Sequence, residues 1–318
     1  MLYSIFLILI GFILLMGGAE YLVKGAVAIA NKIKIPTIIV GLTIVAFGTS
    51  TPEFVVSIKS ALTGSAGISL GNIIGSNIAN ILLILGITAL ISPIKCRRRI
   101  FLRDYKFLFI VSILFCIFAL TGSFIRWHGV VFISLLAVFI YHNYRNTKQE
   151  DIADESLSSI ADKSWLYISA ITLAGLAGII YGADVLINGA ATMARILGVS
   201  EEIIGITIIA VGTSLPELAT TVLATIRKQT GVALGNIVGS NIWNIVFIMG
   251  ATSTITDVSV PKQFLYYDIW MMALATAILY PAMMTKARLT RIEGFVFLVV
   301  YIFYITSQVL ISKGIWSF

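Results

Sequence analysis

Apolar stretches long enough to cross a membrane recur along the whole sequence, and they limit the folds that the chain can adopt. A helix crosses the hydrocarbon core of a bilayer with about 20 mostly apolar residues, and its backbone groups are then bonded internally. Of the 318 residues, 58% are hydrophobic and 12% are charged, whereas soluble proteins carry about 25% charged residues. The sequence therefore predicts an all-α membrane protein that crosses the bilayer many times.

We expect ten transmembrane helices. Their predicted ranges are 2–23, 36–62, 67–92, 107–123, 128–143, 165–187, 200–226, 231–255, 264–285 and 292–312. The first range lacks a basic segment before it and a cleavage-like break after it, so we interpret it as a span and not as a cleaved signal. A hydrophilic stretch at 143–164 separates the fifth and sixth spans and is too short for a folded domain. Two cysteines, Cys96 and Cys116, are too few for a disulfide framework or a metal cluster.

The chain repeats itself at an offset of 164 residues. Residues 41–90 and 205–254 align without gaps and share 23 identities in 50 positions. The domain organisation that follows is a first repeat at 1–142 with its motif at 41–80, a linker at 143–164, and a second repeat at 165–318 with its motif at 205–244. Because each repeat holds five spans, an odd number, the second repeat must enter the membrane from the opposite side.

The positions of the basic residues agree with an inverted repeat. Seventeen of the 22 Lys and Arg residues fall on one face of this arrangement, and five on the other. The basic face is cytoplasmic by the positive-inside rule, so both termini lie outside. Basic residues in short loops explain the net charge of +7 without nucleic acid. The absence of a large regulatory loop favours the plasma (inner) membrane of a prokaryote.

A carboxylate stands beside a proline at matching positions of the two repeats. Residues 48–53 read GTSTPE and residues 212–217 read GTSLPE, which puts Glu53 and Glu217 deep within their predicted spans. A charged side chain there costs about 2.5–3.5 kcal/mol on insertion scales, so such residues are functional by default. Pro52 and Pro216 remove a backbone N–H and free a carbonyl one turn earlier. Interrupted spans at matching positions indicate the central site of a transporter.

Helical spacing brings oxygen-bearing side chains onto one face of each interrupted span. Ala46, Thr49, Ser50 and Glu53 share one face, and Ala210, Thr213, Ser214 and Glu217 repeat the pattern. The next span of each repeat carries Asn72, Ser76 and Asn80, or Asn236, Ser240 and Asn244. Two carboxylates with neutral oxygens suit a hard cation such as Ca²⁺, or sodium ions. We expect Ser76, Asn80, Ser240 and Asn244 to line the site, and Asn77 and Asn241 to be structural. For Asn72 and Asn236, site lining and helix packing stay equally open.

At this point the sequence resembles a known family. The segments GLTIVAFGTSTPE with GNIIGSNIANI, and GITIIAVGTSLPE with GNIVGSNIWNI, are similar to the paired repeats of the sodium/calcium exchanger family. This family belongs to the cation/calcium exchanger superfamily, and the resemblance to its prokaryotic-type minimal members covers essentially the whole chain. It implies a ten-helix bundle that exchanges several sodium ions for one calcium ion by alternating access. Its second, third, seventh and eighth helices would form the core, against which the first and sixth would slide.

The resemblance also implies the ligands. Calcium would bind Glu53, Glu217, Thr49, Thr213 and the backbone carbonyls of Ala46 and Ala210. Sodium would bind the same carboxylates together with Ser50, Ser76, Ser214 and Ser240. The protein would be an antiporter of Na⁺ and Ca²⁺ in the lipid bilayer, not an enzyme, with no cofactor and no evident protein partner.

Two departures from relatives bear on the coupling ion. Some relatives carry an acid where Asn244 stands, a pattern that the potassium-dependent branch resembles, so Asn244 favours exchange without potassium. Proton-coupled relatives carry other core acids and a His, whereas His128 and His142 lie near span ends. Proton- or potassium-coupled cation antiport on the same fold is the alternative.

Two other functional classes fit less well. An intramembrane aspartyl protease needs a close pair of Asp residues that share a proton, whereas the two acids here are Glu residues among hydroxyl ligands. A passive calcium channel would not need a site so fully polar and charged, which indicates occlusion of the ion.

Overall fold

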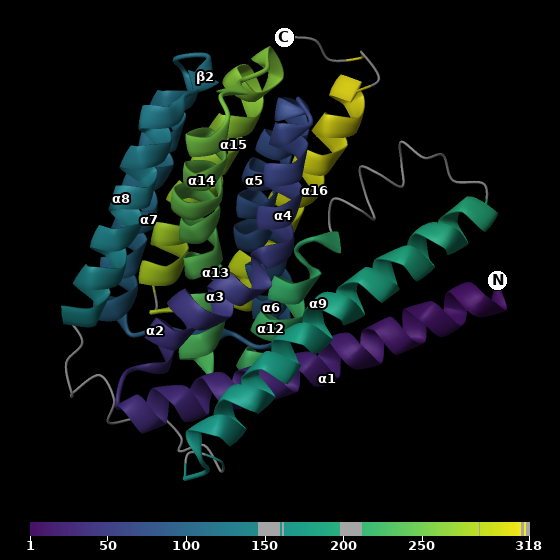
Figure 1. Cartoon of the computed structure of the whole chain (residues 1–318), viewed down its shortest axis with the longest axis vertical. Coiled ribbons are helices and arrows are strands. Elements are labelled where there is room, and N and C mark those ends of the chain that lie inside the picture. The colour runs from purple at the N-terminus through teal and green to yellow at the C-terminus, as the bar shows by residue number, and fades with distance from the viewer. Residues whose placement is uncertain (146–159, 161, 198–211, 286, 313–314, 316–318) are drawn as a thin grey trace. The chain divides into compact units, whose positions relative to one another are not determined.

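The computed structural model describes residues 1–145, 160, 162–197, 212–285, 287–312 and 315 (Figure 1). In this part of the chain, six helices are long and apolar enough to cross a membrane: Leu2–Ile33, Ala66–Ile91, Trp165–Ile196, Thr230–Ile255, Phe264–Met284 and Arg291–Ile311. A broken pair, Thr37–Thr49 with Thr51–Leu62, counts as a seventh crossing. The predicted spans at 107–123 and 128–143 fall within helices α7 and α8. Only the second part of the predicted span 200–226 lies within the described residues.

The described chain forms two compact units, of which the first comprises Met1–Thr49 and Thr147–Asn236. Its elements are α1 (Leu2–Ile33), α2 (Thr37–Val40), the π-helix η1 (Gly41–Val45), α3 (Ala46–Thr49), α9 (Trp165–Ile196), α12 (Leu215–Ile226) and the beginning of α13 (Thr230–Ile242). The helix α1 also contacts α12.

Small residues let α1 and α9 pack side by side along their length (Figure 1). Gly11, Gly18 and Gly25 recur every seven residues on α1, and each faces the backbone or a short side chain of α9. A Cβ atom on Gly18 would lie 2.6 Å from the backbone nitrogen of Ile179. Since Gly11 meets Leu186 and Gly25 meets Thr172, the two helices run antiparallel.

The second unit comprises Ser50–Asn146 and Ile237–Phe318. Its first part holds α4 (Thr51–Leu62), α5 (Ala66–Ile78), η2 (Ala79–Ile84), α6 (Leu85–Ile91), β1 (Ile94–Lys95), α7 (Arg98–Ala119), β2 (Ser123–Phe124) and α8 (Arg126–Arg145). Its second part holds the end of α13, η5 (Trp243–Met249), α14 (Gly250–Ile255), β3 (Val258–Ser259), η6 (Phe264–Asp268), α15 (Ile269–Met284), β4 (Arg288–Leu289) and α16 (Arg291–Ser312).

Contacts inside the second unit are duplicated in the way that the sequence offset suggests. The strand β1 pairs with β4, and β2 pairs with β3, both antiparallel. The helix α6 packs on α16, and α14 packs on α8. Glycines make both helix contacts close, because Gly86 meets Gly294 and Gly250 meets Phe132 and Ile133. Each strand pair holds two loops on the same side of the unit.

Three predicted helix boundaries were wrong. The helices α1 and α9 continue past the predicted ends at 23 and 187 to Ile33 and Ile196. The charged or polar residues beyond those ends hid helix that small buried residues such as Ala26 and Ala30 pack. The 32 residues of α1 rise about 48 Å, more than the hydrocarbon core is thick, so α1 must tilt or extend beyond it. The helix α7 begins at Arg98, not at 107, so the arginine-rich segment is helical.

The linker is shorter at both ends than its predicted range 143–164. The helix α8 runs to Arg145, and Ser164 caps the start of α9 by accepting a hydrogen bond from the backbone N–H of Tyr167 at 3.2 Å. Most of the remaining linker lies outside the described residues.

Candidate functional site

The first interrupted helix breaks at Ser50, directly before Pro52 and Glu53. Ser50 has φ −84° and ψ 8°, and α4 begins at Thr51 with the proline in its first turn. A proline is tolerated there because the first N–H groups of a helix have no partner within it. Glu53 lies in the same turn and is 1% exposed. The positive end of the helix dipole therefore acts on this buried carboxylate.

Asn72 on α5 fixes the start of α4. Its amide nitrogen Nδ2 donates to the carbonyl oxygen of Glu53 at 3.0 Å and to Oγ of Ser57 at 2.8 Å. Asn72 thus bonds the backbone of the residue that carries the carboxylate. Sequence analysis did not single out Ser57, although its position one turn after Glu53 is a signal that spacing alone offers.

The first unit repeats this arrangement. Ser214 has φ −87° and ψ 3°, and α12 begins at Leu215 with Pro216 and the buried Glu217 in its first turn. Nδ2 of Asn236 donates to the carbonyl oxygen of Glu217 at 3.4 Å and to Oγ1 of Thr221 at 3.0 Å. Every partner stands 164 residues after its counterpart. The two arrangements are therefore one local structure made twice.

Thr49 adds a further contact in the first unit. Its hydroxyl donates to Oδ1 of Asn236 at 3.1 Å and lies 3.3 Å from the carbonyl oxygen of Ala46. Ala46 and Thr49 are both fully buried, and Thr213 is partly buried. Ala210, predicted as the counterpart of Ala46, lies outside the described residues.

The asparagines of the third and eighth predicted spans lie in π-helical segments. Asn80 is in η2 and Asn244 is in η5, whose first residues stand 164 apart. Single π turns within α-helices are frequent at functional sites. Oδ1 of Asn80 and both amide atoms of Asn244 are buried and have no hydrogen-bond partner among the described residues. Because buried polar atoms are nearly always bonded in proteins, these are candidates for ion ligands.

The second unit brings several predicted residues onto packed elements. The helix α4, which carries Glu53, contacts η5, which carries Asn244, and the rings of Phe54 and Phe247 stack at 4.9 Å between them. The predicted residues in the second unit are Ser50, Glu53, Asn72, Ser76, Asn80, Ser240 and Asn244. Those described in the first unit are Ala46, Thr49, Thr213, Ser214, Glu217 and Asn236.

Residues assigned to structural roles bond within their own helices. Nδ2 of Asn77 donates to the carbonyl of Ile73 at 2.7 Å, and Nδ2 of Asn241 donates to that of Ile237 at 3.1 Å. His128 stacks on Phe118 at 4.1 Å, and its Nδ1 accepts from the backbone N–H of Ile125. Packing thus accounts for all three side chains.

Gly48 and Gly212 have a packing role that the sequence did not reveal. A Cβ on Gly48 would lie 2.8 Å from a methyl carbon of Leu176, and one on Gly212 would lie 2.5 Å from a methyl carbon of Ile187. Both side chains belong to α9. The helix α9 therefore packs directly against the glycine of each GTS motif.

The donors in both units are oxygens from carboxylate, hydroxyl, amide and carbonyl groups. No group of three or more His, Cys, Asp or Glu residues occurs within the described ranges. A cation held by these donors must draw on neutral oxygens beside the carboxylates. Calcium and sodium accept such ligands readily.

A family model described as sodium/calcium exchanger protein matches residues 3–145 and 167–310. The chain belongs to the sodium/calcium exchanger family. It is therefore an integral membrane protein of a family of cation/calcium antiporters, which are transporters and not enzymes.

Relatives and solved structures of this exchanger family match over nearly the whole chain. The sodium/calcium exchanger MaX1 of Methanosarcina acetivorans is 31% identical over 338 residues, covering 93% of this chain and 95% of that protein. The inner membrane protein YrbG of Escherichia coli is 32% identical over 264 residues, covering 80% and 81%. The structure of the sodium-calcium exchanger NCX_Mj soaked without Na⁺ and Ca²⁺ has a TM-score of 0.84 at 30% identity, covering 96% and 98%.

Proposed function

We propose that this exchanger moves sodium and calcium in opposite directions across the membrane by alternating access. The observation that carries the proposal is the duplicated unit of Asn, Glu and hydroxyl, made once by Asn72, Glu53 and Ser57. Asn236, Glu217 and Thr221 make it again. An interrupted span with a buried carboxylate in each repeat is typical of a secondary transporter's central site.

Glu53 and Glu217 supply the charge for calcium in this proposal, with Thr49, Thr213 and the carbonyls of Ala46 and Ala210. Ser50, Ser214, Ser76 and Ser240 join the same carboxylates to bind sodium. Asn80 and Asn244 line the site, and their unbonded amide atoms support that role. The bonds from Asn72 and Asn236 to the backbone carbonyls of the two Glu residues favour a positioning role for these asparagines.

The ten-span inverted repeat is part of the proposal. The helices α1 and α9, equivalent by the 164-residue offset, pack antiparallel, as inverted repeats require. The strand pairs join loops that the basic-residue count assigns to the same face. The repeats are 1–142 and 165–318, with both termini outside the plasma membrane of a prokaryote.

Calcium uptake into proteoliposomes tests this function. Vesicles loaded with sodium are diluted into a sodium-free and potassium-free buffer that contains radioactive calcium. We expect uptake that depends on the outward sodium gradient, that is lost in Glu53→Gln and Glu217→Gln, and that persists in Asn77→Ala. Normal uptake in either Glu variant would contradict the site assignment.

The same assay separates the alternative coupling ions. Uptake that appears only with external potassium would assign potassium coupling and overturn the interpretation of Asn244. Uptake driven by an outward proton gradient without sodium would assign proton coupling.

A further inference from the structure

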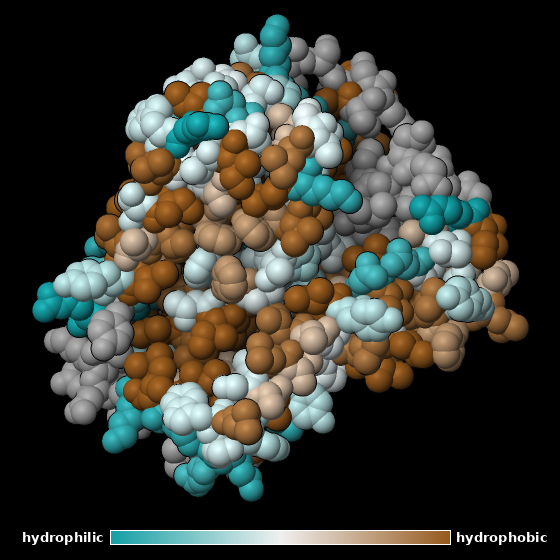
Figure 2. Space-filling model, in the orientation of Figure 1, coloured by the Kyte–Doolittle hydropathy of each residue, from teal (hydrophilic) through white to brown (hydrophobic). Residues whose placement is uncertain are grey.

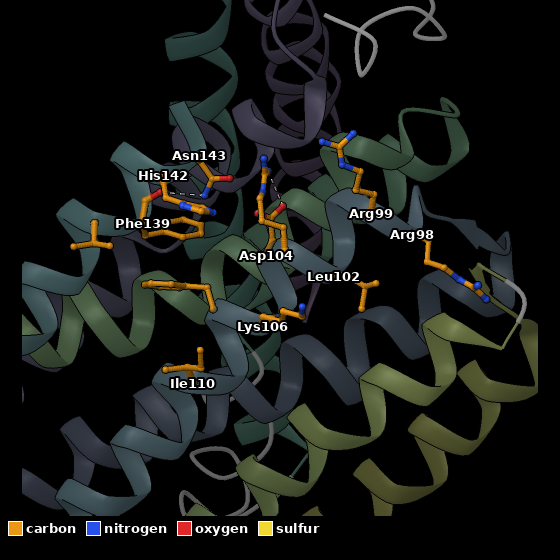
Figure 3. A pocket seen from close by; sticks show the side chains of 12 residues that line it. Arg98, Arg99, Leu102, Asp104, Lys106, Ile110, Phe139, His142 and Asn143 are labelled. Atoms are coloured by element: carbon orange, nitrogen blue, oxygen red, sulfur yellow. Dashed lines mark hydrogen bonds and ion pairs between the residues drawn. The ribbon is translucent and has the colours of Figure 1, made fainter. Parts of the chain in front are cut away.

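A basic pocket opens between α7 and α8, at the end of these helices where α7 begins. Its volume is about 790 Å³, and its wall carries Arg98, Arg99, Arg103, Lys106 and His142. Figure 3 shows His142, Phe139 and Asn143 from α8 on one side and Leu102, Asp104 and Lys106 from α7 on the other. None of these residues belongs to the ion site proposed above.

Two of the basic side chains are already engaged within the protein. Arg103 forms a two-point ion pair with the buried Asp104, with Nε–Oδ1 at 2.8 Å and Nη2–Oδ2 at 3.2 Å. Arg98 donates from Nη2 to the carbonyl oxygen of Met284 at 2.6 Å. Asp104 is therefore neutralised by its neighbour and does not offset the rest of the pocket.

Arg99 and Lys106 remain available to a ligand. Both are exposed, and within the described ranges neither forms an ion pair or a side-chain hydrogen bond. They lie seven residues apart on α7, so two helical turns place them on the same side of the helix. The beginning of α7, whose free N–H groups favour anions, adds to their positive field.

The remainder of the pocket is apolar and continues into the membrane-facing surface. Ile110 and Val138 line it and are 60% and 56% exposed. Further along α7, Ile113 and Ile117 are also exposed, and in Figure 2 hydrophobic side chains cover much of the visible surface of α7 and α8. A ligand that fits this pocket combines an anionic head with an apolar tail.

The other repeat lacks the basic wall at the matching place. Asp268 stands 164 residues after Asp104 and is equally buried. It accepts hydrogen bonds from Tyr304 and Gln308 instead of pairing with an arginine. Gln263 stands where the first repeat has Arg99, and it donates to Gln308 at 2.7 Å. The basic wall is therefore confined to the end of the molecule where α7 begins, and is not a requirement of the shared fold.

We propose that this pocket binds an anionic phospholipid from the leaflet that contacts the beginning of α7. Arg99 and Lys106 contact the headgroup phosphate, and the acyl chains lie along Ile110 and Val138. Basic pockets between transmembrane helices on the cytoplasmic side suit acidic headgroups. The proposal goes beyond ion exchange and is independent of which ion is coupled.

Native mass spectrometry of the purified full-length protein with phosphatidylglycerol tests the proposal. We expect the wild type to retain phosphatidylglycerol in preference to phosphatidylcholine. The double variant Arg99→Gln/Lys106→Gln should bind it about 30-fold more weakly, from the usual contribution of two basic residues near an anionic surface. The matched control Lys59→Gln/Lys262→Gln removes two exposed charges outside the pocket and should bind like the wild type.

A charge-retaining variant separates binding from folding. Arg99→Lys/Lys106→Arg should keep the lipid, and thermal unfolding of every variant checks its integrity. Equal phosphatidylglycerol binding by the wild type and the Arg99→Gln/Lys106→Gln variant would overturn the proposal. Binding of inorganic phosphate that this variant loses, with lipid binding unchanged, would assign the pocket to a soluble anion and would also overturn it. No readout uses calcium transport, so these outcomes are distinct from failure of the exchange function.

Discussion

Asn72 and Asn236 each bond the backbone of a Glu residue, which gives them a role distinct from direct ion binding. We predict that Asn72→Ala raises the calcium concentration for half-maximal uptake about tenfold, because two hydrogen bonds that hold Glu53 contribute about 1 kcal/mol each. The maximal rate should change less, since the carboxylate is still present. Initial rates of uptake over a range of calcium concentrations measure both quantities.

Asn77→Ala is the control for this prediction, because the Asn77 amide bonds only to its own helix at Ile73. It should leave the half-maximal concentration within about twofold of the wild type, as for a change outside the site. A normal half-maximal concentration in Asn72→Ala would show that Glu53 is held without Asn72.

The residues that carry charge were easier to predict from the sequence than those that position them. Glu53 and Glu217 stood out because a carboxylate deep in an apolar stretch is costly wherever the helix turns. The role of Asn72 stayed open because spacing gives the face of its helix but not the reach of its amide to α4. Gly48 was interpreted through the helix break alone, since its contact with Leu176 on α9 requires the tertiary packing.

At the scale of elements, the glycines of α1 decide how closely it approaches α9. We predict that Gly18→Ala lowers the melting temperature of the purified protein, because its Cβ would lie 2.6 Å from the backbone nitrogen of Ile179. Backbone atoms cannot yield as a flexible side chain can, so the helices must separate, which typically costs about 1–3 kcal/mol. Thermal unfolding in detergent measures the change.

Gly17→Ala is a matched control in the same turn of α1. A Cβ on Gly17 meets nothing within 4 Å, so the substitution only improves helix propensity, by about 1 kcal/mol. The two variants should therefore shift the melting temperature in opposite directions. Equal shifts would contradict the close packing of α1 on α9.

The existence of the helices followed from hydropathy, but their ends and internal distortions did not. Lys24 and Lys32 interrupt the apolar pattern of α1, yet the helix continues because Ala26 and Ala30 pack on its buried side. The π segments η2 and η5 left no mark in composition. They depend on small shifts of hydrogen bonding that periodicity does not encode.

At the scale of the whole molecule, the proposed orientation places Cys96 on the cytoplasmic side, next to the β1–β4 strand pair. Burial raises the pKa of its thiol to about 11. Since the thiolate is the reactive form, its fraction at neutral pH is about 100-fold lower than for an ordinary cysteine. We predict that a membrane-impermeant maleimide labels Cys96 only from the cytoplasmic side, slowly at neutral pH and faster as pH rises towards 11.

Right-side-out and inverted vesicles measured by mass spectrometry give the side of labelling, and Cys96→Ser removes the signal. Cys116 is buried within α7 and should not contribute. Labelling of Cys96 in right-side-out vesicles alone would invert the proposed orientation of the whole chain.

The balance of charge over the transport cycle makes a last prediction. Two buried carboxylates carry a formal charge of about −2, which one calcium ion or two sodium ions balance. If a third sodium ion moves per calcium, one net charge crosses the membrane in each cycle, worth about 2.3 kcal/mol per 100 mV. In sodium-loaded vesicles this charge moves outward as calcium enters, so an inside-positive potential should accelerate calcium uptake and an inside-negative one should slow it. Potassium gradients with valinomycin set the potential, and uptake that ignores it would mean that two sodium ions exchange for each calcium.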